Sequence, residues 1–249
     1  MRLQLYPEEP TIDRARSLTA IARRAIALSL AFVSLETVAD TSATVAFLSD
    51  YRYRGASLTG GRPSLKLNVS ADSAWGLYGG AQVAGVHYGD AAIWEAQLLA
   101  NAGFARSFGN GYAWEVGLTD VTYSHQHDYD YRDWYAGVST DAELSLRAHY
   151  SHEYYGEPMG AVYLELDKAW RVTNERSLFG HVGYLHVTPK AGAAPAHRDY
   201  FDVRAGVAQE FGQVHAELAW VVTNSAVPIV TDEPPRIRHA IEIVLSRSF

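Results

Sequence analysis

In all but the N-terminal part of the chain, apolar and polar residues alternate one by one in segment after segment. In residues 64–70, for example, Leu65, Leu67 and Val69 are separated by polar side chains. Such alternation places the apolar side chains on one face of a strand and the polar ones on the other. A helix would instead spread the polar side chains of residues 94–104 around its circumference and leave no apolar stripe. The chain is therefore predicted to consist of β-strands.

Twelve segments follow this pattern, an even number, as an up-and-down barrel with both ends on one side requires. The predicted strands are residues 44–53, 64–71, 75–86, 93–105, 112–123, 133–140, 143–153, 160–170, 177–187, 200–210, 213–223 and 239–249. Short links, such as Asp72-Ser73, alternate with mostly longer ones, such as residues 124–132. Outer-membrane barrels combine short periplasmic turns with longer outer loops in this way. The predicted fold is all-β: a single antiparallel up-and-down transmembrane β-barrel of about twelve strands.

The mean hydropathy of −0.14 is compatible with this fold. The part of the chain after the N-terminal segment lacks the run of about 20 apolar residues that a membrane-spanning helix needs, whereas a barrel carries apolar residues at every second position. Aromatic residues near the predicted strand ends are expected to form girdles at the two bilayer interfaces. These are Tyr51, Tyr53, Trp75, Trp94, Phe104, Tyr112, Trp114, Trp134, Tyr150, Trp170 and Trp220. The alternative is a soluble β-sandwich with cross-strand aromatic pairs.

Residues 1–39 are predicted to be a signal segment that is removed on export. Arg23 and Arg24 precede an apolar run, residues 25–35, which is too short to cross a bilayer but has the length of a signal-peptide core. Small residues then lead to a cleavage site after Ala39. The polar stretch before the run is long, which is compatible with a start codon assigned too early; the alternative is a buried helix of a soluble domain. Residues 40–249 would form the barrel in the bacterial outer membrane, after export through the periplasm.

A motif at the start of the predicted barrel, Ser49-Asp50-Tyr51-Arg52-Tyr53-Arg54-Gly55-Ala56-Ser57-Leu58-Thr59, resembles the opening motif of the TorF family of porins. The strand at residues 63–70, the run at residues 76–80 and the terminal Phe249 are also similar to that family. The resemblance covers most of the predicted barrel and is sharpest over its first two strands. It implies an outer-membrane barrel of the porin class and brings no catalytic residues. A terminal aromatic residue implies recognition by the barrel assembly machinery.

If the apolar faces contact lipid, the opposite faces line a pore. The predicted pore-lining residues are Asp50, Arg52, Lys66, Gln82, Glu95, Gln97, Glu115, Arg147, His149, Glu165, Asp167, Asp202, Arg204, Glu217 and Glu242, with Arg54 on the same face at the outer rim. Asp50 and Arg52 are expected on one strand, where both can bridge to neighbouring strands. Acidic residues outnumber basic ones by eight to four within the strands, which predicts a weak cation preference. The alternative is that the charges pair and plug the barrel.

The predicted function is a porin-like channel for small hydrophilic solutes, with outer-membrane lipid as its surroundings and no cofactor. The net charge of −7 argues against nucleic-acid binding. A non-conducting barrel that is structural or binds a ligand through its outer loops is the second hypothesis. A lipid hydrolase is a weaker one, since His149 and Ser151 share a face but the chain has no nucleophile-elbow motif. The loop at residues 124–133 holds two histidines and three aspartates, but their spacing matches no metal signature, and no metal site is predicted.

Overall fold

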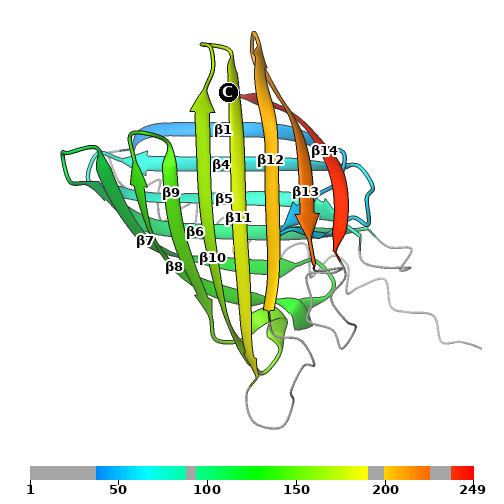
Figure 1. Ribbon diagram of the computed structural model, residues 1–249. Helices are drawn as coiled ribbons and strands as arrows, with labels where there is room; N and C mark the ends of the chain where they lie inside the picture. The colour runs from blue at the N-terminus through cyan, green and yellow to red at the C-terminus, as the bar shows by residue number, and fades with distance from the viewer. Residues whose placement is uncertain (1–37, 88–93, 190–198, 225–236) are drawn as a thin grey trace, which may run out of the picture.

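The computed structural model describes residues 38–87, 94–189, 199–224 and 237–249. Within these ranges, twelve strands pair antiparallel in one closed sheet (Figure 1). The strands of this wall are β1 (Val38–Leu48), β4 (Ser64–Ser73), β5 (Leu77–Val86), β6 (Glu95–Ser107), β7 (Tyr112–Tyr123), β8 (Tyr131–Thr140), β9 (Leu144–Ser151), β10 (Met159–Arg171), β11 (Arg176–Pro189), β12 (Asp199–Phe211), β13 (Val214–Thr223) and β14 (Arg238–Ser248). The predicted antiparallel barrel of twelve strands is confirmed.

Each wall strand pairs with its neighbours along the chain, and the sheet closes where β14 meets β1. The register of this seam runs from Thr44 opposite Ser248 to Leu48 opposite Val244. Beyond the end of β14, the amide of Phe249 donates to the carbonyl of Ala43 at 2.8 Å. Along this seam, closure pairs the two sheet edges, whose unpaired backbone groups would be costly in lipid.

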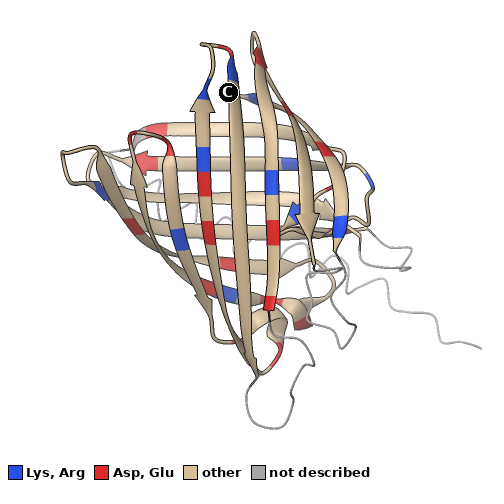
Figure 2. Ribbon diagram, in the orientation of Figure 1, with Lys and Arg blue, Asp and Glu red and all other residues tan. Residues whose placement is uncertain are grey.

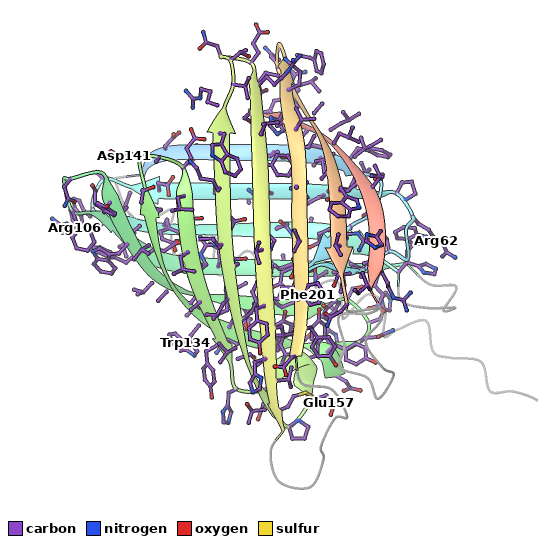
Figure 3. The ribbon with its side chains drawn as sticks, in the orientation of Figure 1. Arg62, Arg106, Trp134, Asp141, Glu157 and Phe201 are labelled. Carbon is purple, nitrogen blue, oxygen red and sulfur yellow. The ribbon has the colours of Figure 1, made fainter. Side chains whose placement is uncertain are left out.

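The links are sorted by length, as predicted. Short turns, such as residues 141–143 and 212–213, lie at one end of the barrel, here named the short-turn end, together with the C-terminus (Figure 1). Longer links lie at the opposite, long-loop end; two of them contain the 3₁₀ helices η1 (His127–Tyr129) and η2 (Tyr154–Gly156). In Figure 3, Asp141 marks the short-turn end and Glu157 the long-loop end.

The outer surface of the wall is apolar. Side chains with large exposed fractions include Leu65 at 66%, Trp134 at 60% and Ile241 at 60%, and Figure 3 shows Trp134 projecting away from the barrel. An apolar surface of this extent is stable against lipid rather than water. Among the described residues, no helix is long and apolar enough to cross a membrane.

The first predicted strand, residues 44–53, is wrong at both ends. The wall strand β1 begins six residues earlier and ends at Leu48. After Leu48 the chain turns into the barrel and forms a small hairpin of β2 (Arg52–Tyr53) and β3 (Ala56–Ser57). Tyr51 and Tyr53 therefore belong to the interior and not to an aromatic girdle; Tyr51 is only 4% exposed. We name residues 49–62 the luminal hairpin.

The predicted signal segment lies outside the described residues apart from its last two, Val38 and Ala39, which belong to β1. Its division from the barrel after Ala39 stays a prediction. Most of the predicted outer loops at residues 188–199 and 224–238 also lie outside the described residues.

Candidate functional site

The luminal hairpin turns within two residues. Arg52 pairs with Ser57 and Tyr53 with Ala56, which leaves Arg54 and Gly55 as the turn. Both residues have positive φ angles, 49° and 74°, as the tight turn favoured in β-hairpins requires. Glycine adopts this conformation without strain, whereas arginine does so only at a cost of about 1 kcal/mol or more. The contacts of Arg54 offset that cost.

Asp50 holds the base of the hairpin together. Its Oδ1 accepts hydrogen bonds from the hydroxyls of Ser57, at 2.5 Å, and Thr59, at 2.9 Å, and from the amide of Gly61 at 3.3 Å. Its Oδ2 lies 2.7 Å from Nη2 of Arg52. The expectation that Asp50 and Arg52 bridge to neighbouring wall strands is therefore wrong, because they pair with each other within the hairpin.

Arg54 anchors the tip of the hairpin. Its guanidinium forms an ion pair with Asp133 of β8, and both side chains are almost completely buried. The guanidinium also lies over the rings of Tyr163 of β10, at 4.7 Å, and Tyr154 of η2, at 5.6 Å. Burial alone lowers the pKa of Arg54, but the Asp133 carboxylate raises it well above its ordinary value, so the guanidinium stays charged. The predicted place of Arg54 at the outer rim of a wall strand is wrong.

The hairpin reaches opposite sides of the wall. The hydroxyl of Tyr51 donates to Gln97 of β6 at 2.7 Å and accepts from Gln82 of β5 at 2.9 Å. At the tip, a Cβ atom on Gly55 would overlap the side chain of Asp202 of β12. Because β5 and β12 lie on opposite arcs of the closed sheet, the hairpin crosses the lumen.

The inner wall from β7 to β14 carries a network of ion pairs, which we name the charged belt. It comprises Glu115, Arg147, His149, Glu165, Asp167, His181, Asp202, Arg204, Glu217 and Glu242. Figure 2 shows acidic and basic segments close together along β9, β10 and β12. In the first part of the belt, Arg147 lies 2.5 Å from Glu115 and 3.2 Å from Glu165. His149 also lies 3.2 Å from Glu165.

The second part of the belt has two bridging cations. His181 lies between Asp167, at 2.7 Å, and Asp202, at 3.0 Å. Arg204 lies between Glu217, at 2.5 Å, and Glu242, at 2.7 Å. Each cation thus contacts two carboxylates, so the belt keeps its charges paired along the wall.

One trio in the belt has the geometry of a metal site. Ligand atoms of Glu165, Asp167 and His181 lie within 4.8 Å of one another. However, both ring nitrogens of His181 already contact carboxylates, as in a protonated imidazole that donates from both nitrogens. A metal ligand needs a free lone pair, so this arrangement favours an ion-pair bridge over a metal centre. The loop at residues 124–133, whose histidines and aspartates match no metal signature, lies within the described residues. There the ring of His127 contacts the carboxylate of Asp130 at 3.3 Å.

A cavity of about 590 Å³ lies between the luminal hairpin and the charged belt. Its lining includes five basic residues, Arg52, Arg54, Lys66, Arg147 and Arg204, and five acidic residues, Glu165, Asp167, Asp202, Glu217 and Glu242. Its volume lies within the range of small-molecule sites. The excess of acidic residues expected from the sequence is therefore absent around this cavity.

The structure places the predicted lumen residues of the wall strands on the inner face; whether they line a conducting pore stays a prediction. Glu95 lies at the long-loop end, where its carboxylate accepts from the amides of His125 and Gln126. Gln97 joins Tyr51 to Tyr123 in a neutral network on the other side of the lumen. Sequence reasoning missed three interior residues with strong contacts, namely Asp133, Tyr163 and His181.

His149 and Ser151 do not form the hydrogen-bonded pair of nucleophile and base that a hydrolase needs. The hydroxyl of Ser151 donates to the carbonyl of Arg132 at 2.9 Å, and Nε2 of His149 contacts Glu165. A nucleophile needs its base within hydrogen-bonding reach, and these two side chains are engaged elsewhere.

A closed antiparallel sheet that is apolar outside and charged inside defines the class of outer-membrane β-barrels. The fold is similar to the NanC porin, with 9% identity, a TM-score of 0.57, and 84% of this chain and 99% of that chain covered. It is also similar to the COG4313 outer membrane channel from Pseudomonas putida F1, with 10% identity, a TM-score of 0.50, and 87% and 97% covered. At these identities the likeness concerns the fold alone.

Within this class, residues 35–249 match the family described as bacterial protein of unknown function (Gcw_chp). The chain therefore belongs to the Gcw_chp family. No curated protein matches the sequence.

Proposed function

We propose that the protein is a porin-like channel of the TorF type, which lets small hydrophilic solutes diffuse across the bacterial outer membrane. The observation that carries this proposal is the cavity of about 590 Å³ inside the closed sheet, whose lining includes ten arginine, lysine, aspartate and glutamate side chains. Charged groups are costly in a dry interior and tolerable in water. A hydrated lumen inside an apolar outer wall is the arrangement of a channel.

The luminal hairpin would act as the constriction of this channel. It crosses the lumen near the long-loop end and is fixed to β8 by the Arg54–Asp133 ion pair. A solute would then pass between the hairpin and the charged belt. The paired charges of the belt would supply polar contacts without a strong net field, which suits passive diffusion.

The surroundings and partners follow from the outer wall. Its exposed apolar side chains would contact outer-membrane lipid. Phe249, which lies beside the seam, would be recognised by the barrel assembly machinery after export through the periplasm. The weak cation preference predicted from the sequence remains part of the proposal. The five acidic and five basic residues around the cavity balance each other, so the cavity itself adds no support to this preference.

A second candidate is a non-conducting barrel with a structural or ligand-binding role. It is favoured by the same hairpin, because a segment that crosses the lumen and is tied to opposite arcs of the wall can also close it. The enzyme alternative receives no support from the separate contacts of Ser151 and His149.

The test is single-channel recording of the purified protein in a planar bilayer with a salt gradient. Discrete current steps are the expected result, with a reversal potential slightly to the cation-selective side. Stable insertion without steps would favour the non-conducting barrel. Recovery of the protein in a soluble periplasmic fraction would contradict the membrane proposal itself.

A further inference from the structure

Lys66 differs from the other basic residues of the cavity. It lies on β4 with its side chain on the inner face, partly buried against the cavity. Among the described residues, its ammonium group has no hydrogen bond and no ion pair, whereas Arg147 and Arg204 each contact two carboxylates. Lys66 therefore offers three unused donors to the lumen.

The acidic residues that act on Lys66 are already engaged. Glu217 and Glu242 attract its charge, and Arg204 repels it. Their carboxylates, however, are held by Arg204 at 2.5 and 2.7 Å, and Glu217 also contacts His215 at 3.0 Å. Arg204 contacts both of these carboxylates, and Lys66 lines the cavity without pairing with either of them.

A second basic residue, Arg52, lines the hairpin side of the same cavity. Nε of Arg52 is buried and has no hydrogen-bond partner. The other nitrogens of this guanidinium contact the carbonyl of Gly55 and the carboxylate of Asp50. Asp50 in turn accepts from Ser57, Thr59 and Gly61. Within the described lining of the cavity, Lys66 on the wall is thus the cation with free donors, whereas Arg52 on the hairpin has its terminal nitrogens engaged by Gly55 and Asp50.

We propose that Lys66, on the wall of this cavity, forms a subsite for the anionic group of a small organic solute. The proposal rests on the proposed function, because it names a class of organic solute that one site in the channel would bind in transit; a local site for an anionic group is compatible with a weak preference of the whole lumen for small cations. The anionic group is a carboxylate or a phosphate, since both supply the charged oxygen acceptors that an ammonium binds. A volume of about 590 Å³ admits a solute of a few carbon atoms beside the charged belt.

A competing explanation is that Lys66 serves only to balance the charge of Glu242. In that case the ammonium would need no ligand, and its removal would leave the binding of anions unchanged. The two explanations differ in what Lys66→Gln does to anion affinity, and that difference can be measured.

The experiment follows the binding of succinate to the purified full-length protein in detergent by saturation-transfer NMR on the succinate methylene protons. Inorganic phosphate, which competes with succinate, is the second arm, and the neutral succinamide is the matched control ligand. The variants are Lys66→Gln and Lys66→Arg. Lys168→Gln removes the same charge outside the cavity lining, where the ammonium contacts the carbonyl of Ala142. Heat-modified migration on a gel shows that each variant is folded.

We expect saturable succinate binding that weakens about tenfold or more in Lys66→Gln, because one charge-assisted hydrogen bond is lost. Lys66→Arg and Lys168→Gln should bind as the wild type does, and succinamide should not bind. Competition by phosphate at similar concentration indicates a site for either anion, and absence of competition indicates a carboxylate site. Equal affinity of Lys66→Gln and wild type, or no saturable binding, overturns the proposal.

Conductance in potassium chloride, measured separately, distinguishes this proposal from the proposed function. Conductance without succinate binding overturns the subsite and leaves the channel. Binding without conductance overturns the channel and leaves the subsite as the ligand site of a closed barrel. Should Lys66→Gln fail to fold, the subsite is tested by Lys66→Met, which removes the ammonium group and is expected to weaken succinate binding as well.

Discussion

Arg54 and Asp133 form an ion pair inside the barrel, although one lies at the tip of the luminal hairpin and the other on the wall strand β8. Neither group has access to solvent that would replace its partner. The pair therefore anchors the tip of the hairpin to the wall, and it is the first contact that we would remove.

Arg54→Gln should destabilise the folded barrel by about 3–5 kcal/mol, because it leaves the Asp133 carboxylate buried without a counter-ion. Urea unfolding followed by tryptophan fluorescence measures this change. Arg132→Gln is the control, because Arg132 pairs with Asp120 at 3.1 Å on the exposed surface. It should cost at most about 1 kcal/mol. Similar losses in both variants would contradict the anchoring role of Arg54.

Restoring neutrality provides the complementary test. The double variant Arg54→Gln with Asp133→Asn replaces the ion pair by two amides and should recover part of the lost stability, since no uncompensated charge remains. If the stability lost in the double variant equals the sum of the losses in the two single variants, the two side chains do not act as a pair.

Gly55→Ala should dislodge the tip of the hairpin. A methyl group there meets the side chain of Asp202, and φ is 74°. Gly212→Ala, at the short-turn end, has a φ of 65° and open space around it, so it carries only the backbone cost of about 1 kcal/mol. We expect Gly55→Ala to lose more stability than Gly212→Ala and to raise single-channel conductance. Unchanged conductance would mean that the hairpin does not form the constriction.

Tyr51→Phe should cost about 1–3 kcal/mol, because Gln82 and Gln97 would lose a buried hydrogen-bond partner. The measurement is again the midpoint of urea unfolding. Tyr112→Phe removes a hydroxyl from an exposed tyrosine and should change stability by less than about 0.5 kcal/mol. If both variants unfolded alike, the neutral network on β5 and β6 would not hold the base of the hairpin.

The belt should control ion selectivity. Glu242→Gln removes a negative charge from the cavity wall and should move the reversal potential toward anions, whereas Arg204→Gln should move it toward cations. Glu143→Gln, at the exposed short-turn end, is the control and should leave the potential unchanged. A shift of the same sign from Glu242→Gln and Arg204→Gln would contradict the assignment of these groups to the ion path.

The wall could be predicted from the sequence because the side-chain period of a strand is fixed. Once Leu65 and Leu67 are assigned to the outer face, Lys66 must point inward, and the same argument places Arg147 and Glu165. A short turn fixes the register between the two strands that it joins, so an error in the bounds of one predicted strand does not change the face assigned to residues of the others.

The luminal hairpin could not be predicted in this way. Residues 50–54 alternate as a wall strand would, and polar side chains are suitable both for a lumen-facing strand and for a hairpin within the lumen. The distinguishing signal was Gly55, at a turn that needs positive φ, together with the hydroxyls of Ser57 and Thr59 that satisfy Asp50. His181 was not predicted because Gly180 and Gly183 interrupt the alternation of apolar and polar residues around it.

The luminal hairpin leaves the wall at Leu48, and the strand that ends there, β1, is also the one to which β14 pairs when the sheet closes. A slip of β1 by one residue would turn every one of its side chains to the other face and would displace the hairpin along the barrel axis. The interior and the wall are therefore not separable modules for a protein engineer. A wider pore would require a new design for a seam strand as well as the removal of the segment that crosses the lumen.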